Sequence, residues 1–173
     1  MANLEVLQKK IAHRLEALRQ GADPTPYRVR GCDALLDGLA RRGATCYLAS
    51  GTDELFVVEE ARLLGLDAYF GQRIYGARDD YQSFSKKMLL ERLRTDHGLR
   101  GTELAAFGDG YVEIESAREV GGLAIGVASR ENGELGWDAW KKERLIATGA
   151  QVLVPDWQES ELLLSFLCGE THA

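Results

Sequence analysis

The feature that most restricts the fold of this chain is a regular alternation of short apolar runs with amphipathic segments from residue 32 onward. The apolar runs are typical of buried strands, and the segments between them carry leucines at helical spacing. This alternation predicts a mostly parallel sheet with helices on both faces. A length of 173 residues and a hydrophobic content of 45% are enough for one domain with a real core. We therefore expect an α/β fold in three layers.

The expected elements follow from this pattern and from the residues that punctuate it. We expect strands over residues 45–49, 73–75, 104–107, 123–127 and 151–154, and helices over residues 4–20, 32–42, 53–64, 86–97, 112–120, 141–148 and 159–167. Two prolines within Gly21–Pro26 predict a turn or linker after the first helix. Ser85 precedes another helix and is expected to cap it.

Charge and cysteine usage exclude several classes of partner. The net charge is -6 and charges of both signs are scattered, which argues against nucleic-acid binding. No apolar run approaches the roughly 18 residues of a membrane span, so we expect no membrane partner. Three widely spaced cysteines, Cys32, Cys46 and Cys168, indicate reduced thiols and a cytoplasmic protein. We expect Cys32 and Cys46 to be small core residues.

Polar residues follow three of the expected strands, at residues 50–52, 108–110 and 128–130, on the sheet edge where ligands of parallel α/β folds bind. At the first, Ser50-Gly51-Thr52 ends a strand and opens a helix. A hydroxyl and free backbone amides at a helix N-terminus form an anion site. The alternative is a plain helix cap at Ser50 or Thr52. From this stretch alone both interpretations stay open.

The second place is the stretch after Phe107, where Asp109 and Glu113 lie four residues apart. Asp109 follows the strand, and Glu113 in the first helical turn can point back toward it. Two converging carboxylates repel each other, and a hard cation such as Mg²⁺ relieves that repulsion. The alternative is that Asp109 caps the helix and Glu113 complements its dipole.

A third signal is Lys86-Lys87 at the start of a helix, where the dipole disfavours a cation. A bound phosphate would explain a lysine there, and a solvated surface pair is the alternative. Trp137, Trp140 and Trp157 lie in the last third of the chain. We expect them to pack loops and the last helix against the sheet rather than to stack on a substrate.

The order of these signals resembles the second, third and fourth motifs of the haloacid dehalogenase superfamily of hydrolases. The motifs are carried by LASGT, FSKKML and GDGYVE, and the resemblance runs from about residue 28 to residue 167. The stretches LASGTDE, ARLLGLDAYFGQRIYGARDDYQSFSK, FGDGYVEIE and VGGLAIGVAS resemble the hydrolase domains that occur beside sugar-kinase domains. The resemblance implies a Rossmann-like hydrolase, usually a Mg²⁺-dependent phosphatase that works through an aspartyl-phosphate.

The resemblance also implies roles for individual residues. Ser50 would hydrogen-bond the transferring phosphoryl group, with Gly51 and Thr52 completing the phosphate site. Lys86 would offset the charge of the phosphate and the nucleophile, and Lys87 is the alternative if the register slips by one. The metal would be held by Asp109, with Glu113 supporting it directly or through water; an aspartate is more usual at the position of Glu113.

The first motif of the family, Asp-x-Asp-x-Thr or Val, has no match in this chain, because no two of its aspartates are separated by a single residue. That motif carries the nucleophile at the end of a first, central strand. Residues 1–27 then correspond to a remnant of the helical cap with its return linker, and residues 28–173 to the core. Without the first strand, its two neighbours must pair, recruit another segment or leave backbone groups unpaired.

Two functional hypotheses follow. In the first, the chain is the larger part of a phosphatase that acts on a small phosphorylated metabolite, such as a sugar phosphate, and is itself nearly inactive. In the second, it is a non-catalytic relic that binds a phosphorylated ligand or a protein partner. Mg²⁺ binding is expected to be weakened or lost without the first motif, and the incomplete sheet favours self-association.

Overall fold

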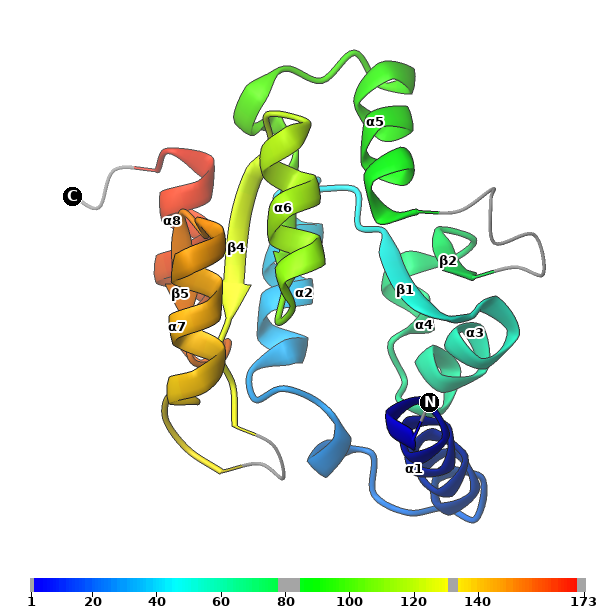
Figure 1. The fold of residues 1–173 in the computed structure, drawn as a ribbon. Helices are drawn as coiled ribbons and strands as arrows, with labels where there is room; N and C mark the ends of the chain where they lie inside the picture. The colour runs from blue at the N-terminus through cyan, green and yellow to red at the C-terminus, as the bar shows by residue number, and fades with distance from the viewer. Residues whose placement is uncertain (1, 78–84, 131–133, 171–173) are drawn as a thin grey trace.

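The computed structural model describes residues 2–77, 85–130 and 134–170, with side chains from residue 9 onward (Figure 1). In chain order the elements are α1 (Ala2–Arg19), η1 (Thr25–Tyr27), α2 (Cys32–Arg41), β1 (Leu48–Asp53), α3 (Glu54–Leu63), α4 (Asp67–Phe70), β2 (Ile74–Ala77), α5 (Lys86–Asp96), η2 (Gly101–Glu103), β3 (Ala105–Gly108), α6 (Tyr111–Glu119), β4 (Leu123–Val127), α7 (Ala139–Thr148), β5 (Val152–Val154) and α8 (Ser160–Cys168). The predicted α/β architecture is confirmed. Across the described residues, no helix combines the length and apolarity that crossing a bilayer requires.

The strands form two separate parallel groups. β1 pairs with β2, and β3 pairs with β4, which pairs in turn with β5. β1 and β3 are not paired, and no other described strand lies between them. Of the three arrangements left open by the sequence, the described residues adopt the one in which these two edges have no partner strand. Backbone donors and acceptors on those edges are thus available for a further strand.

Helix α2 holds the two groups of strands together (Figure 1). Its adjacent residues Leu35 and Leu36 point about 100° apart and enter different apolar clusters. Leu35 packs with Val127, Trp157, Leu163 and Leu164, whereas Leu36 packs with Val57, Ala61, Phe70 and Ile74. Cys32 and Leu39 lie against both clusters. The core is therefore continuous through α2 although the sheet is not.

Both cysteines of the α2–β1 region behave as the sequence predicted. Cys32 and Cys46 are half-buried and pack against the apolar clusters. Burial raises the pKa of both thiols, which favours their protonated form. Cys168 is exposed at the end of α8.

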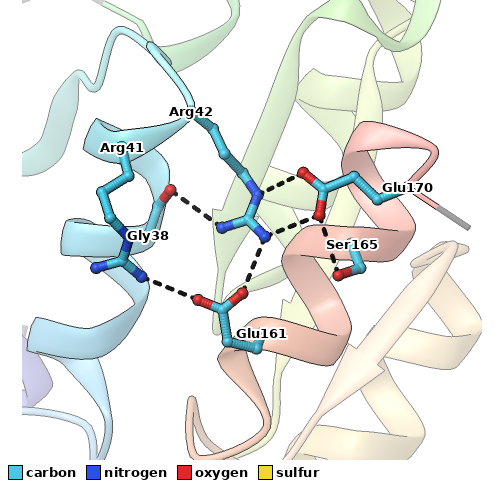
Figure 2. A network of polar contacts seen from close by, with 6 residues as sticks. All are labelled: Gly38, Arg41, Arg42, Glu161, Ser165 and Glu170. Atoms are coloured by element: carbon cyan, nitrogen blue, oxygen red, sulfur yellow. Dashed lines mark hydrogen bonds and ion pairs between the residues drawn. The ribbon is translucent and has the colours of Figure 1, made fainter. Parts of the chain in front are cut away.

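An ionic network ties the C-terminal end of α2 to α8 (Figure 2). Arg42 donates to Glu170 through Nε and Nη2, at 2.8 and 2.9 Å, and through Nη2 to Glu161 at 2.9 Å. Arg41 donates to the other oxygen of Glu161 at 2.9 Å. The bonds from Arg42, and then those from Arg41, hold the pKa of the Glu161 carboxyl below its usual value. The network fixes α8 against the C-terminal end of α2.

Gly38 lets the same two helices approach closely. A methyl group at this position would overlap Cδ1 of Leu164, which is fully buried. Glycine is costly inside a helix, so its presence in the middle of α2 has a packing reason.

Near the site, β1 is the strand whose bounds differ from the predicted ones. β1 begins three residues later than predicted and runs to Asp53, so Ser50, Gly51 and Thr52 lie inside it. The pairing with β2 resumes at Asp53 after an irregularity, which extends the strand past the predicted end. Asp53 therefore caps α3, its carboxylate accepting from the amide of Leu55 at 2.9 Å. The alternative of a plain helix cap at Ser50 or Thr52 is therefore wrong. Ser85, in contrast, caps α5 as predicted.

Candidate functional site

The site is built around the loop that joins β3 to α6. Asp109 follows the last residue of β3, and its side chain is 65% exposed. Glu113 lies in the first turn of α6 and folds back over the loop. A Cβ placed on Gly108 would lie 2.5 Å from Cβ of Glu113, and one on Gly110 would lie 2.6 Å from Oε2 of Glu113. The two glycines thus make room for the returning glutamate, and both acids face the same loop.

Each of these carboxylates is paired with a lysine from another helix. Lys86, at the start of α5, forms a salt bridge with Glu113, and the two side chains are only 21% and 20% exposed. Lys141, in the first turn of α7, lies with Nζ 3.2 Å from Oδ2 of Asp109. Lys86 of α5 and Lys141 of α7 therefore each pair with one of the two carboxylates that follow β3.

The choice between the two lysines of α5 depends on helix geometry. Lys87 points along α6 to Glu119, with 2.8 Å between Nζ and Oε2, and both side chains are about half exposed. This hydrogen bond raises the pKa of Lys87. Lys86 is therefore the lysine that the structure places against the acidic loop, and Lys87 lies outside it.

Ser50, Gly51 and Thr52 lie on the other side of the gap in the sheet. The hydroxyl of Ser50 accepts a hydrogen bond from the amide of Thr52 at 3.1 Å. Among the contacts of the described residues, none joins Ser50 to Lys86 or to Asp109. The structure thus brings together Lys86, Asp109 and Glu113, and leaves the β1 residues across the gap.

The acidic pair is suited to a partial metal shell. No three His, Cys, Asp or Glu side chains of the described residues are grouped closely enough to hold a metal by themselves. Mg²⁺ in phosphate sites uses one or two carboxylates and takes its other ligands from water and phosphate oxygens. Asp109 and Glu113 fit that kind of site, with the exposed Asp109 in the better position to reach the ion directly.

Lys141 was missed in the sequence analysis, although the same argument that singled out Lys86 applies to it. Asp138 caps α7 through a 2.8 Å bond from the amide of Lys141, which puts that lysine at a helix start. A cation there is disfavoured by the dipole and needs a partner. Its side chain is 15% exposed, and its partner is Asp109.

A small cavity of roughly 200 Å³ lies beside Asp109. It is lined by Val29, Phe107, Gly108, Asp109, Val127, Ser129 and Trp157. Phe107 and Trp157 meet edge to face, with 5.6 Å between ring centroids, and form an apolar floor. The cavity therefore offers an apolar wall with a carboxylate and a hydroxyl at its polar side.

The three tryptophans behave differently from one another. Trp157 is 8% exposed and packs in the core, as predicted. Trp137 and Trp140 are 36% and 64% exposed, so the expectation that they pack against the sheet is wrong. Each instead lies under a cation of α7: Lys142 above Trp137, and Arg144 above Trp140.

A family model described as haloacid dehalogenase-like hydrolase matches residues 4–121. The chain belongs to the haloacid dehalogenase-like hydrolases. The predicted family is thereby confirmed, and the second, third and fourth motif stretches all fall within the matched range.

The chain spans less than two thirds of the length of each of the similar proteins described next. Over 97 residues it is 32% identical to a 5'-nucleotidase of Pseudomonas aeruginosa, a match that covers 56% of this chain and 43% of the relative. A haloacid dehalogenase-like protein of Agrobacterium tumefaciens has a TM-score of 0.65 at 18% identity, over 81% of this chain and 61% of its own. A family hydrolase of Deinococcus radiodurans, solved with phosphate and sodium, has a TM-score of 0.66 at 16% identity, over 84% and 62%. These structures support the Rossmann-like fold.

Proposed function

We propose that this chain is the larger part of a Mg²⁺-dependent phosphatase that hydrolyses a small phosphorylated metabolite. The observation that carries the proposal is the meeting of Lys86, Glu113, Asp109 and Lys141 at the carboxyl end of β3. Lysines and a partly coordinated cation are what the charge of a transferring phosphoryl group requires. The family membership supports hydrolysis as the reaction.

In this proposal each side chain has one task. Lys86 donates to a phosphate oxygen and is oriented by its bond to Glu113. Ser50 donates its hydroxyl to another phosphate oxygen, and the amide of Gly51 lines the same position. The amide of Thr52 donates to Oγ of Ser50 and orients that hydroxyl. Asp109, supported by Glu113, would hold Mg²⁺. The ion when bound would polarise the phosphoryl oxygens as a Lewis acid.

The nucleophile is the remaining requirement. The family reaction uses an aspartate of an Asp-x-Asp motif, and this chain contains no such spacing. We infer that the aspartate is supplied by an extended segment that pairs with the free edges of β1 and β3 in the complete protein. A carboxylate at the end of such a strand would lie between Ser50 and Asp109, where the transferred phosphoryl group must be.

The substrate class has two candidates. The resemblance to kinase-associated hydrolase domains favours a sugar phosphate. The 5'-nucleotidase relative favours a nucleoside monophosphate. A non-catalytic role in binding a phosphorylated ligand is the alternative function, favoured by the absence of an Asp-x-Asp pattern from the sequence.

The test compares this chain with a longer product that includes any in-frame Asp-x-Asp strand encoded upstream. With Mg²⁺ and an aryl phosphate, we expect negligible phosphate release from the chain alone and clear release from the longer product. Lys86→Met and Asp109→Asn in the longer product should each lower kcat about 10²- to 10³-fold or more, because each removes a preorganised charge. Lys87→Met is the matched control and should leave kcat unchanged, because Lys87 points to Glu119.

Two results would contradict the proposal. If no Asp-x-Asp strand is encoded upstream, or if the longer product is inactive, the proposed catalytic function is wrong. The alternative function, binding of a phosphorylated ligand without catalysis, then stands. If the chain alone hydrolyses the aryl phosphate and Asp109→Asn abolishes it, the nucleophile lies within the 173 residues.

A further inference from the structure

Two exposed aromatic rings lie directly beside the acidic loop. Tyr111 is the first residue of α6 and Trp140 the second of α7, and they are 49% and 64% exposed. Neither ring belongs to the apolar clusters of the described core. Tryptophan is usually well buried, and exposed aromatic groups that gather on a surface mark binding sites.

A guanidinium group holds the two rings in place. The Cζ atom of Arg144 lies 4.3 Å from the centroid of the Trp140 ring and 5.3 Å from that of the Tyr111 ring. Such cation–π contacts at a surface restrict the side chains that make them. Arg144 therefore links the two rings, and we call these three side chains the Tyr–Arg–Trp surface; Trp140 keeps more than half of its area accessible.

The Tyr–Arg–Trp surface is connected to the acidic site through both of its helices. Tyr111 follows Asp109 by two residues, so their Cα atoms are at most about 7.6 Å apart. Trp140 directly precedes Lys141, whose Nζ lies 3.2 Å from the Asp109 carboxylate. The Tyr–Arg–Trp surface therefore lies on the same two helices that carry Glu113 and Lys141.

We propose that the Tyr–Arg–Trp surface binds the base of a nucleoside monophosphate. The proposal rests on the proposed phosphate site and names its substrate class. A purine or pyrimidine ring can stack on the exposed part of the Trp140 ring, and the Arg144 guanidinium suits an anionic ligand. A simple sugar phosphate has no aromatic ring, so it would make no stacking contact with Tyr111 or Trp140.

Calorimetric binding to the chain itself tests this without turnover. We expect adenosine 5'-monophosphate to bind about 5- to 150-fold more tightly than ribose 5-phosphate, the ratio that one stacked base contributes. Trp140→Ala should bring the ratio close to one by weakening only the nucleotide. Trp137→Ala is the matched control, because the Trp137 ring does not belong to the Tyr–Arg–Trp surface and contacts Lys142, whose Nζ lies 4.6 Å from the ring centroid. This variant should leave the affinity ratio unchanged.

Equal affinities for the two phosphates, or a ratio that survives Trp140→Ala, would overturn the proposal. A third titration with adenosine, followed by fluorescence, separates the base site from the phosphate site. If neither phosphate binds but adenosine quenches fluorescence in a Trp140-dependent way, the base site stands and the phosphate site is wrong. If adenosine also fails to bind, the stacking site itself is refuted.

Discussion

The contact between Lys86 and Glu113 allows a quantitative test of the site that needs no substrate. Lys86→Met removes the ammonium group from a carboxylate that is only 20% exposed. Breaking a fully buried pair costs about 3–5 kcal/mol, and an exposed pair contributes about 0–1 kcal/mol. This pair lies between those limits, so we take about 2–3 kcal/mol for its loss. Removing a cation from the start of α5 restores about 0.3–1 kcal/mol of dipole energy. The expected net destabilisation is therefore about 1–3 kcal/mol.

Urea unfolding measures this change, with the fluorescence of the buried Trp157 as one reporter of the core. A double-mutant cycle with Lys86→Met, Glu113→Gln and the double variant isolates the coupling between the two side chains. We expect the double variant to be more stable than the sum of the single changes predicts, by about 1–2 kcal/mol. Lys87→Met is the control, and its exposed pair with Glu119 should give no measurable change.

Two results would refute this reasoning. An unchanged unfolding midpoint for Lys86→Met would mean that the carboxylate of Glu113 is solvated without its partner. Strictly additive changes in the cycle would mean that the two groups do not interact in the folded state. Either result would remove the main structural support for placing Lys86 at the acidic loop.

Two further predictions concern the contact between α2 and α8. Gly38→Ala should destabilise the protein in urea by up to about 2 kcal/mol, because overlap with Leu164 outweighs a gain of about 1 kcal/mol in helix propensity. Leu164→Ala in the same chain should make the added methyl group tolerable, whereas a rise in stability from Gly38→Ala alone would show that no overlap exists. The second prediction concerns acid: Arg42 lowers the pKa of Glu161 from its usual 4.5, so the stabilisation is present above that pH and is lost as the pH falls through the lowered value. Unfolding midpoints at about pH 6 and about pH 3 should therefore differ less for Glu161→Gln than for the parent, and an equal difference would contradict the assignment.

Local patterns were enough to predict the class of fold, the order of its elements and one side of the site. Periodicity identified α2, α6 and β4 closely, because each depends on its own burial pattern. The approach of Glu113 to the loop after Asp109 was also predictable, since residues four apart on a helix share a face. The family could be identified from the order of three such local motifs, because this order is present although the first motif is absent.

Only the tertiary structure decided which groups meet across long separations. Lys141 reaches Asp109 from 32 residues away, and the distinction between Lys86 and Lys87 depends on how α5 lies against α6. The extension of β1 through Ser50 depends on a ladder with β2, which no local propensity encodes.

The exposure of Trp140 and the separation of the strands into two groups also depend on tertiary contacts. Whether a tryptophan is buried depends on which helix covers it, and whether two edges pair depends on what else can lie between them. Apolar spacing in the sequence specifies that a side chain prefers burial, but it carries no information on the partner. The sequence by itself therefore determined the elements and their chemistry, while packing between distant elements determined the site.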